Sequence, residues 1–299
     1  AKIRKESVRG PFAVRRSLAA LGYQETINFS FVEERWEQEL AGNPAPLKLL
    51  NPIASQMSVM RTSLLGSLLQ VVKFNLDRKA DRVRVFELGR VFLRDASVKN
   101  SDTTVEGLSQ PMRVSGVAYG PVSSTSWGGK VRNVDFFDVK GEVEALLAPA
   151  KPVFVSAEHP AMHPGRCAQV SLHGHVVGHV GELHPRWRQS WDLQQAPILF
   201  ELDLDAVLHR DVPVAQGVAK FQAVERDIAV VVAEKVTHSE LMAAVHEAPT
   251  SGLLRSAVLF DVFRPQASLG IEKSLAVRLV LNSDEASLTD VQIESTVKS

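Results

Sequence analysis

Apolar residues recur at intervals of three and four between residues 63 and 76, where leucines and valines form one helical stripe. The stripe is wide enough to dock on a sheet, and Ser63 is a residue type that caps helix amino termini. Residues 83–92 follow a short polar connection, are rich in valine and phenylalanine, and contain Gly89 at a predicted bend. The pattern predicts a helix that leads into a buried strand.

Residues 26–32 alternate between apolar and polar, with Ile27, Phe29 and Phe31 on one side and polar residues on the other. This alternation predicts a strand in a half-polar sheet. The other elements expected before residue 209 are a helix at 7–21, a strand at 114–119, a helix at 135–147, a hairpin turning at His173-Gly174, a strand at 197–205 and a helical turn at 204–208.

The chain changes character after residues 209–220, which contain Pro213 and Gly217 and read as an interdomain linker. The elements that follow are a strand at 226–233, a helix at 238–247, strands at 253–263 and 274–281, and a helix at 288–298. Their order is that of a ferredoxin-like unit without its last strand.

At 299 residues the chain should divide into two domains, residues 1–209 and 210–299. A content of 45% hydrophobic and 23% charged residues fits a globular protein. The formal net charge of zero argues against a generic nucleic-acid coat or a membrane-surface protein. The chain has no apolar run long enough to cross a bilayer, and one cysteine, Cys167, fits a reducing cytoplasm. Because the sequence starts without methionine and stops inside a helical pattern, we expect a fragment or an incompletely ordered chain.

Candidate chemistry is sparse. Six of the nine histidines lie between His159 and His184, but no cysteine pair or H-E-x-x-H accompanies them, so a metal site is not expected. Residues 121–130 contain two glycines and a lysine without the spacing of a phosphate-binding loop. Cys167 reads as a small strand residue rather than a nucleophile. No nucleophile elbow, triad or carboxylate pair assigns a catalytic role to any residue.

Several motifs, in order, resemble the β subunits of bacterial phenylalanyl-tRNA synthetases. In the first domain these are GYQETINFSFV at 22–32, LNPIASQMSVMRTSLLGSLL at 50–69, VFELGRVF at 85–92, HPGRCAQV at 163–170, GHVGELHP at 178–185 and FELDLDAVL at 200–208. In the second they are ERDIAVVV at 225–232, LFDVFR at 259–264, KSLAVRL at 273–279 and LTD at 288–290.

The resemblance implies an α+β fold: a class II aminoacyl-tRNA synthetase-like antiparallel-sheet core domain without catalytic residues, followed by a ferredoxin-like (RRM-like) anticodon-binding domain that lacks its last strand. It implies part of a cytoplasmic phenylalanine–tRNA ligase, which attaches phenylalanine to tRNA(Phe) using ATP and magnesium. We expect association with the α subunit in an α2β2 heterotetramer and contact with the tRNA anticodon stem, with no activity in the isolated fragment and no cofactor of its own. The alternative is a stand-alone RNA-binding or protein-interaction module that reuses these folds.

Arg61 lies where a class II motif would place its arginine, but Thr62 and Ser63 stand where the motif's acidic partner is expected. Near Gly178 and Gly181, the glycine-rich motif that ends in arginine is also not met. Arg61 is therefore interpreted as structural or interfacial, and the predicted subunit interface consists of Arg61, Leu64 and Leu68.

For tRNA, residues 220–299 carry 8 basic and 11 acidic residues, so binding would depend on a local patch. Arginine and lysine can contact phosphates, and phenylalanine can stack on an unpaired base. Core phenylalanines and solvated arginines remain the alternative. The candidates are Phe221, Arg226, Phe263, Arg264, Lys273 and Arg278.

Overall fold

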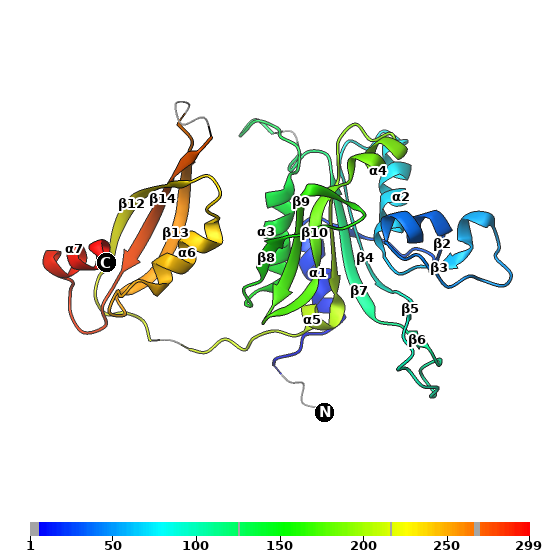
Figure 1. Cartoon of the computed structure of the whole chain (residues 1–299), viewed down its shortest axis with the longest axis horizontal. Helices are drawn as coiled ribbons and strands as arrows, with labels where there is room; N and C mark the ends of the chain where they lie inside the picture. Colours follow the sequence, from blue (N-terminus) through cyan, green and yellow to red (C-terminus); the bar gives the residue numbers. More distant parts are fainter. Residues whose placement is uncertain (1–5, 125, 216, 266–269) are drawn as a thin grey trace. The chain divides into compact units, whose positions relative to one another are not determined.

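The helix predicted from the apolar stripe at residues 63–76 packs on a seven-stranded sheet. The computed structural model describes residues 6–124, 126–215, 217–265 and 270–299. The chain divides into two structural units, residues 1–213 and residues 214–299, and Figure 1 shows the elements of each. Each unit is described below by itself.

The large sheet of the first unit has the strand order β1-β4-β7-β11-β10-β9-β8. Only the β1–β4 pair is parallel, and the other neighbours in this sheet are antiparallel. Two small sheets pair β2 with β3 and β5 with β6. The strands are β1 (Gln24–Glu25), β2 (Phe31–Val32), β3 (Val59–Met60), β4 (Val83–Arg90), β5 (Leu93–Arg94), β6 (Leu108–Ser109), β7 (Met112–Tyr119), β8 (Val153–Ser156), β9 (Met162–Leu172), β10 (His175–Leu183) and β11 (Ile198–Asp203).

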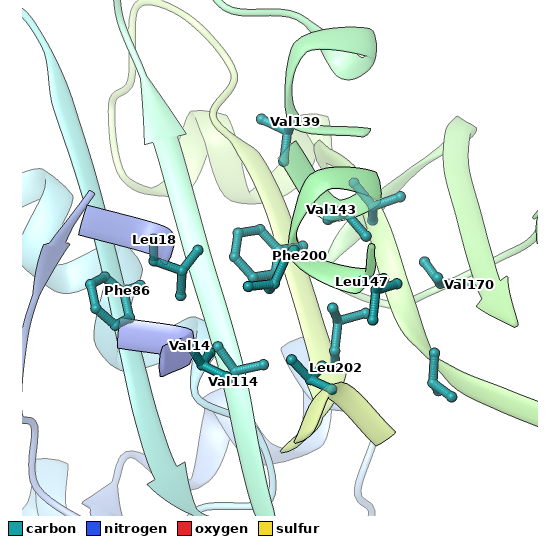
Figure 2. Packing of buried hydrophobic residues seen from close by; sticks show 14 of the residues in the cluster. Val14, Leu18, Phe86, Val114, Val139, Val143, Leu147, Val170, Phe200 and Leu202 are labelled. Carbon is teal, nitrogen blue, oxygen red and sulfur yellow. The ribbon is translucent and has the colours of Figure 1, made fainter. Parts of the chain in front are cut away.

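Helices cover both faces of this sheet. One apolar cluster joins side chains of α1, α3 and α5 to one face, and Figure 2 shows residues of α1, α3, β4, β7, β9 and β11 packed together in this cluster. A second cluster joins α2 and α4 to the other face. The helical elements of the unit are α1 (Pro11–Ala20), η1 (Trp36–Leu40, one turn of π-helix), η2 (Ser55–Met57, one turn of 3-10 helix), α2 (Leu65–Leu76), α3 (Phe136–Leu147), α4 (Pro185–Ser190) and α5 (Leu204–Leu208).

Local sequence explains where several of these elements begin and turn. Asp135 caps α3 and forms a capping box with Asp138, which satisfies backbone donors at the helix start. The β9–β10 hairpin turns at His173 and Gly174, whose φ angles of 49° and 80° suit a two-residue hairpin turn. The predicted hairpin, the helix after Asp135 and the helical turn at α5 are confirmed.

Other sequence expectations were wrong in detail. Residues 26–32 do not form one strand, because β1 ends at Glu25, β2 begins at Phe31 and an extended loop connects them. Ser63 was predicted to cap the helix, whereas α2 begins at Leu65 with Leu64 in the N-cap position. The Ser63 hydroxyl accepts a hydrogen bond from the Leu65 backbone N–H at 3.2 Å. Strand β8 and helix α4 were not predicted.

The second unit is a three-stranded antiparallel sheet in the order β12-β14-β13. Two helices pack on one face of this sheet, and each begins with a capping box. The element order β-α-β-β-α is the predicted one, and the mixed α+β class of both units is confirmed. The elements are β12 (Val224–Ala233), α6 (His238–Glu247), β13 (Leu254–Phe263), β14 (Glu272–Leu281) and α7 (Asp290–Lys298).

No helix in the described ranges is long and apolar enough to cross a bilayer.

Replacing Gly116 in β7 by alanine should destabilise the first unit, because the new Cβ would lie 2.3 Å from Cε1 of Phe200. We expect the free energy of unfolding to fall by about 1 to 3 kcal/mol, as measured by urea denaturation. The control is Gly141→Ala in α3, where a Cβ would have no neighbour within 4 Å. It should raise stability by up to about 1 kcal/mol. Equal stabilities of the two variants would contradict the close packing of Phe200 on β7.

Candidate functional site

Three buried glutamates accept hydrogen bonds from residues 61–64, the short segment between β3 and α2. They come from η1, β4 and β11, which are far apart in the sequence. Together, Glu37, Glu87 and Glu201 are called the glutamate clamp. Glu87 accepts a hydrogen bond from Arg61 Nη2 at 2.7 Å. Glu37 accepts from the Thr62 backbone N–H at 2.9 Å, and Glu201 accepts from the Leu64 backbone N–H at 2.7 Å.

Hydrogen bonds and ion pairs offset the cost of burying the carboxylates of the clamp. Burial raises the pKa of Glu37, and hydrogen bonds from Thr62 and Asn43 lower it in part. The Glu201 carboxylate forms an ion pair with Arg113, whose Nη1 lies 2.8 Å from Oε1. Because an unpaired buried charge is costly, these contacts fix the clamp in one arrangement.

Arg61 is a structural residue in this arrangement. Its side chain is 3% exposed, and it pairs with Glu87 rather than with a residue of its own motif. Its Nε donates to the Arg90 carbonyl at 3.1 Å and its Nη1 donates to the Phe29 carbonyl at 3.3 Å. Its guanidinium is therefore unavailable to a nucleotide phosphate.

The structure also corrects the predicted interface residues. Arg61, Leu64 and Leu68 are all buried in the chain's own interior, and both leucines belong to the cluster beneath α2. A side chain without accessible atoms cannot contact another subunit directly. These three residues can affect an interface only through the residues they hold.

The loop between β1 and β2, unlike those three buried residues, has exposed apolar side chains that another protein could contact. Ile27 is 92% exposed and Phe29 is 67% exposed, whereas Asn28 and Ser30 are half-buried. The alternation was predicted correctly, but its apolar side faces solvent. A groove of about 250 Å³ adjoins these residues. It is lined by Ile27, Asn28, Phe29, Phe31, Val32, Glu33, Trp36, Gln56, Met57, Ser67 and Gln70.

Three of the clustered histidines form hydrogen bonds within local turns of the backbone. His159, His163 and His184 each precede a proline, and each ring Nδ1 accepts from the backbone N–H two residues later at 3.0–3.1 Å. A neutral ring whose Nδ1 accepts carries its proton on Nε2, so neither nitrogen offers a free lone pair to a metal. Across the described residues, no group of three His, Cys, Asp or Glu could hold a metal ion.

A cavity of about 170 Å³ lies beside two of the clustered histidines. The rings of His159 and His179 lie 5.1 Å apart between centroids, with Arg113, Glu201 and Asp203 also lining the cavity. Burial, followed by the nearby His179 and Arg113, lowers the pKa of His159 to about 4. His159 is therefore uncharged at neutral pH.

Cys167 is buried in β9, with its Sγ 3.5 Å from Sδ of Met162. Burial raises the pKa of its thiol to about 11. Since the thiolate is the reactive form, this cysteine is inert at neutral pH.

The second unit presents an open sheet face opposite α6 and α7. Alternate residues of β14, such as Val277 and Leu279, are buried under the helices, so their neighbours face the other way. Cross-strand register places four rows of three residues on this open face. The rows are Glu225-Val280-Ser256, Asp227-Arg278-Val258, Ala229-Ala276-Asp261 and Val231-Ser274-Phe263.

Arg278 occupies the central strand of this open face. Its Nε and Nη2 donate to the two carboxylate oxygens of Asp227 at 2.8 and 2.9 Å. Its guanidinium carbon lies 5.2 Å from the ring centroid of Phe260. The face thus combines one planar cation with exposed aromatic and aliphatic side chains, which suits stacking of planar groups.

Of the six residues proposed for tRNA contact, register brings only Phe263 and Arg278 together on the open face. Arg226 pairs in register with the buried Leu279, so it lies on the helix side of the exposed strand β12. Lys273 is buried and donates to the Glu234 carbonyl at 2.7 Å.

The other two candidates lie at strand ends. The Arg264 guanidinium, just after β13, donates to the Glu234 carboxylate at 2.9–3.2 Å. The Phe221 carbonyl, before β12, accepts from Asn282 at 2.9 Å.

Sequence reasoning missed Phe260 because a bulge changes the side-chain alternation of β13. Register shifts between Leu259 and Asp261, so Phe260 is an extra residue in the ladder. The bulge lets Phe260 and Phe263 share the open face although they are three residues apart. Simple alternation would have separated them.

Two protein families match consecutive parts of the chain. Residues 4–204 match the family described as the phenylalanyl tRNA synthetase beta chain CLM domain. Residues 219–299 match the ferredoxin-fold anticodon binding domain family.

Curated relatives are similar over nearly all of the chain. The phenylalanine–tRNA ligase beta subunit of Cupriavidus pinatubonensis is 50% identical and that of Burkholderia pseudomallei is 49% identical, each over 98% of this chain and 37% of the relative. The Chromobacterium violaceum beta subunit is 46% identical over 95% of the chain and 35% of the relative. The chain thus spans a little over a third of these relatives. A solved pyrrolysyl tRNA synthetase from Desulfitobacterium hafniense is 12% identical, covers 66% of this chain and 65% of its own, and has a TM-score of 0.46.

The buried His159 should make stability depend on pH. Because its pKa is about 4 in the folded state against an ordinary value of 6.5, the folded state binds fewer protons between these values. Stability is therefore fully present above pH 6.5 and decreases as the pH falls towards 4, by up to about 3 kcal/mol from this residue.

The test is the variant His159→Asn, whose side-chain oxygen can still accept the backbone N–H two residues later but does not titrate. Urea denaturation at pH 7 and pH 4.5 should show a smaller loss of stability in this variant than in the wild type. The control is His175→Asn at an exposed position of β10, which should keep the wild-type pH dependence. An identical pH dependence in all three proteins would contradict the buried neutral imidazole.

Proposed function

The chain belongs to the phenylalanyl-tRNA synthetase β-chain family, and on that premise we propose that it is an assembly and tRNA-binding part of a phenylalanine–tRNA ligase. In this proposal, the first unit docks on the α subunit and the second contacts the anticodon stem and loop of tRNA(Phe). The observation that carries the tRNA role is the open face around Arg278, which lies in the unit that matches an anticodon-binding family.

The chemistry of aminoacylation is assigned to the rest of the enzyme. The arginine nearest to a synthetase motif, Arg61, is locked in a buried ion pair, and Cys167 is a buried thiol of raised pKa. ATP, magnesium and phenylalanine are accordingly proposed to bind outside this chain, within a cytoplasmic α2β2 assembly. The isolated chain should not aminoacylate tRNA.

The charge of the second unit favours base contacts over phosphate contacts. Residues 220–299 carry a net charge of minus three, and Asp227 and Asp261 share the open face with Arg278. Stacking on Phe260 and Phe263 is insensitive to this charge, because every base has an apolar face. The unpaired bases of an anticodon loop are the part of a tRNA that offers such faces.

The docking role of the first unit is supported by its exposed apolar residues. Ile27 and Phe29 lie side by side with a groove, and Leu50 and Ile53 are also strongly exposed in the connection between η1 and η2. Exposed apolar side chains beside a groove are typical of a protein interface. The relatives are β subunits of phenylalanine–tRNA ligases, and we therefore propose the α subunit as the partner.

Truncating Phe263 or Arg278 should weaken binding to tRNA(Phe). We expect Phe263→Ala to raise the Kd by about 5- to 100-fold through loss of base stacking. Arg278→Ala should weaken binding several-fold, and any phosphate contact it makes would lower the salt slope of log Kd by about one. Fluorescence anisotropy at two salt concentrations measures both effects, with Phe137→Ala in the exposed first turn of α3 as the control. Unchanged affinity in both variants would refute the open-face assignment.

Placing a charge on the exposed loop should disrupt assembly. Ile27→Asp is expected to abolish co-elution of the chain with the ligase α subunit, because the carboxylate would have to lose its water in an apolar contact. The fold should tolerate this change, since Ile27 is 92% exposed. Val291→Asp, at an exposed position on α7, is the control and should leave co-elution intact. Co-elution of Ile27→Asp at the wild-type level would rule out this loop as the docking surface.

A further inference from the structure

Residues 26–30 keep two large apolar side chains in water while their polar neighbours face the protein. Burying Ile27 and Phe29 would be favourable in isolation, so something must hold this extended loop with its apolar side outward. The contacts under the loop identify what does so. The Thr26 backbone N–H donates to the Phe86 carbonyl at 2.8 Å, which fixes the beginning of the loop on β4.

The remaining contacts lead to the buried pair of Arg61 and Glu87. Asn28 Nδ2 donates to Glu87 Oε2 at 2.8 Å, while the other oxygen of the same carboxylate accepts from Arg61 Nη2 at 2.7 Å. Arg61 Nη1 donates to the Phe29 carbonyl at 3.3 Å, and the Arg61 backbone N–H donates to the Ser30 carbonyl at 3.0 Å. The side chains of one ion pair thus hold Asn28 and Phe29, and the backbone of Arg61 holds Ser30.

This pair gives the loop one stable orientation. Turning Ile27 and Phe29 inward would remove Asn28 from Glu87 and leave a buried carboxylate oxygen without its donor. It would also displace the Phe29 carbonyl, which accepts from the Arg61 guanidinium, and the Ser30 carbonyl, which accepts from the Arg61 backbone N–H. The cost of leaving those buried charged groups unsatisfied opposes the gain from burying the apolar side chains.

We infer that Arg61, Glu87 and Asn28 form a positioning unit that presents Ile27 and Phe29 to the partner subunit. This inference rests on the proposed function, because it takes the α subunit as the occupant of this surface. The adjoining groove is apolar at Phe31, Trp36 and Met57 and amide-bearing at Gln56 and Gln70. It fits a partner segment with an apolar anchor flanked by hydrogen-bonding groups. Arg61 therefore influences the interface although its own side chain is buried.

The test replaces Asn28 by aspartate, which has the same shape but sets a carboxylate against Glu87. We expect Asn28→Asp to raise the Kd for the α subunit by about 10-fold or more and to increase hydrogen exchange in residues 26–30. The matched control is Asn43→Asp, because Asn43 donates to another carboxylate of the clamp, Oε2 of Glu37, at 3.3 Å. This control should lose similar thermal stability but keep its affinity within about 2-fold.

The double variant Asn28→Asp with Glu87→Gln exchanges donor and acceptor across the same contact. The amide nitrogen introduced at position 87 can donate to the carboxylate introduced at position 28, while the amide oxygen accepts from Arg61. Affinity should therefore return to within about 3-fold of wild type. A purely structural role for Glu87 would predict no such rescue.

The possible outcomes separate this inference from the proposed function. If the wild-type chain does not bind the α subunit, the assembly proposal fails and the positioning role fails with it. If the wild type binds, Ile27→Asp does not, and Asn28→Asp binds like wild type, then only the positioning role is overturned. Equal weakening by Asn28→Asp and Asn43→Asp would also overturn it, because the effect would then be general destabilisation.

Discussion

The first unit depends on the burial of three carboxylates around one short segment. Glu37, Glu87 and Glu201 reach residues 61–64 from η1, β4 and β11, so the segment fixes the relation between the large sheet and the start of α2. A buried carboxylate is stable only with donors around it, and here the donors are a guanidinium, a hydroxyl and backbone N–H groups. Removing one partner of such a buried ion pair typically costs about 3 to 5 kcal/mol.

The same constraint explains why a motif-like arginine carries no chemistry in this chain. A guanidinium can bind a phosphate only if its donors are accessible and not already engaged. Arg61 has a carboxylate on one side and two backbone carbonyls on the others, and its side chain is almost completely buried. Its interactions hold a loop in place, which is a contribution to shape rather than to transition-state stabilisation.

Sequence patterns predicted the features that depend only on residues close together in the sequence. The helix predicted at residues 238–247 has the bounds of α6, which Thr237 caps in a capping box with Glu240, and His173-Gly174 gave the β9–β10 turn. The clamp could not be found in this way, because Glu201 lies 137 residues from Leu64 in the sequence. The alternation at residues 26–32 likewise predicts one apolar and one polar face, but it does not determine which of the two faces the rest of the protein covers. The β13 bulge is a property of the paired strands, so Phe260 could not be assigned to the open face from its own strand.

Burial decides what arginine does in each unit. Arg61 and Glu87 have side chains that are 3% and 4% exposed, so their pairing cannot be exchanged for another partner without stranding a charge. Arg278 and Asp227 form a bidentate pair, but their side chains are 47% and 46% exposed. Water can replace either partner there, and such a pair contributes little net stability. Arg278 can therefore exchange Asp227 for another partner at little cost, while its contact with the Phe260 ring keeps it on the open face. One residue type thus serves as a fixed internal support in the first unit and as an exchangeable contact in the second.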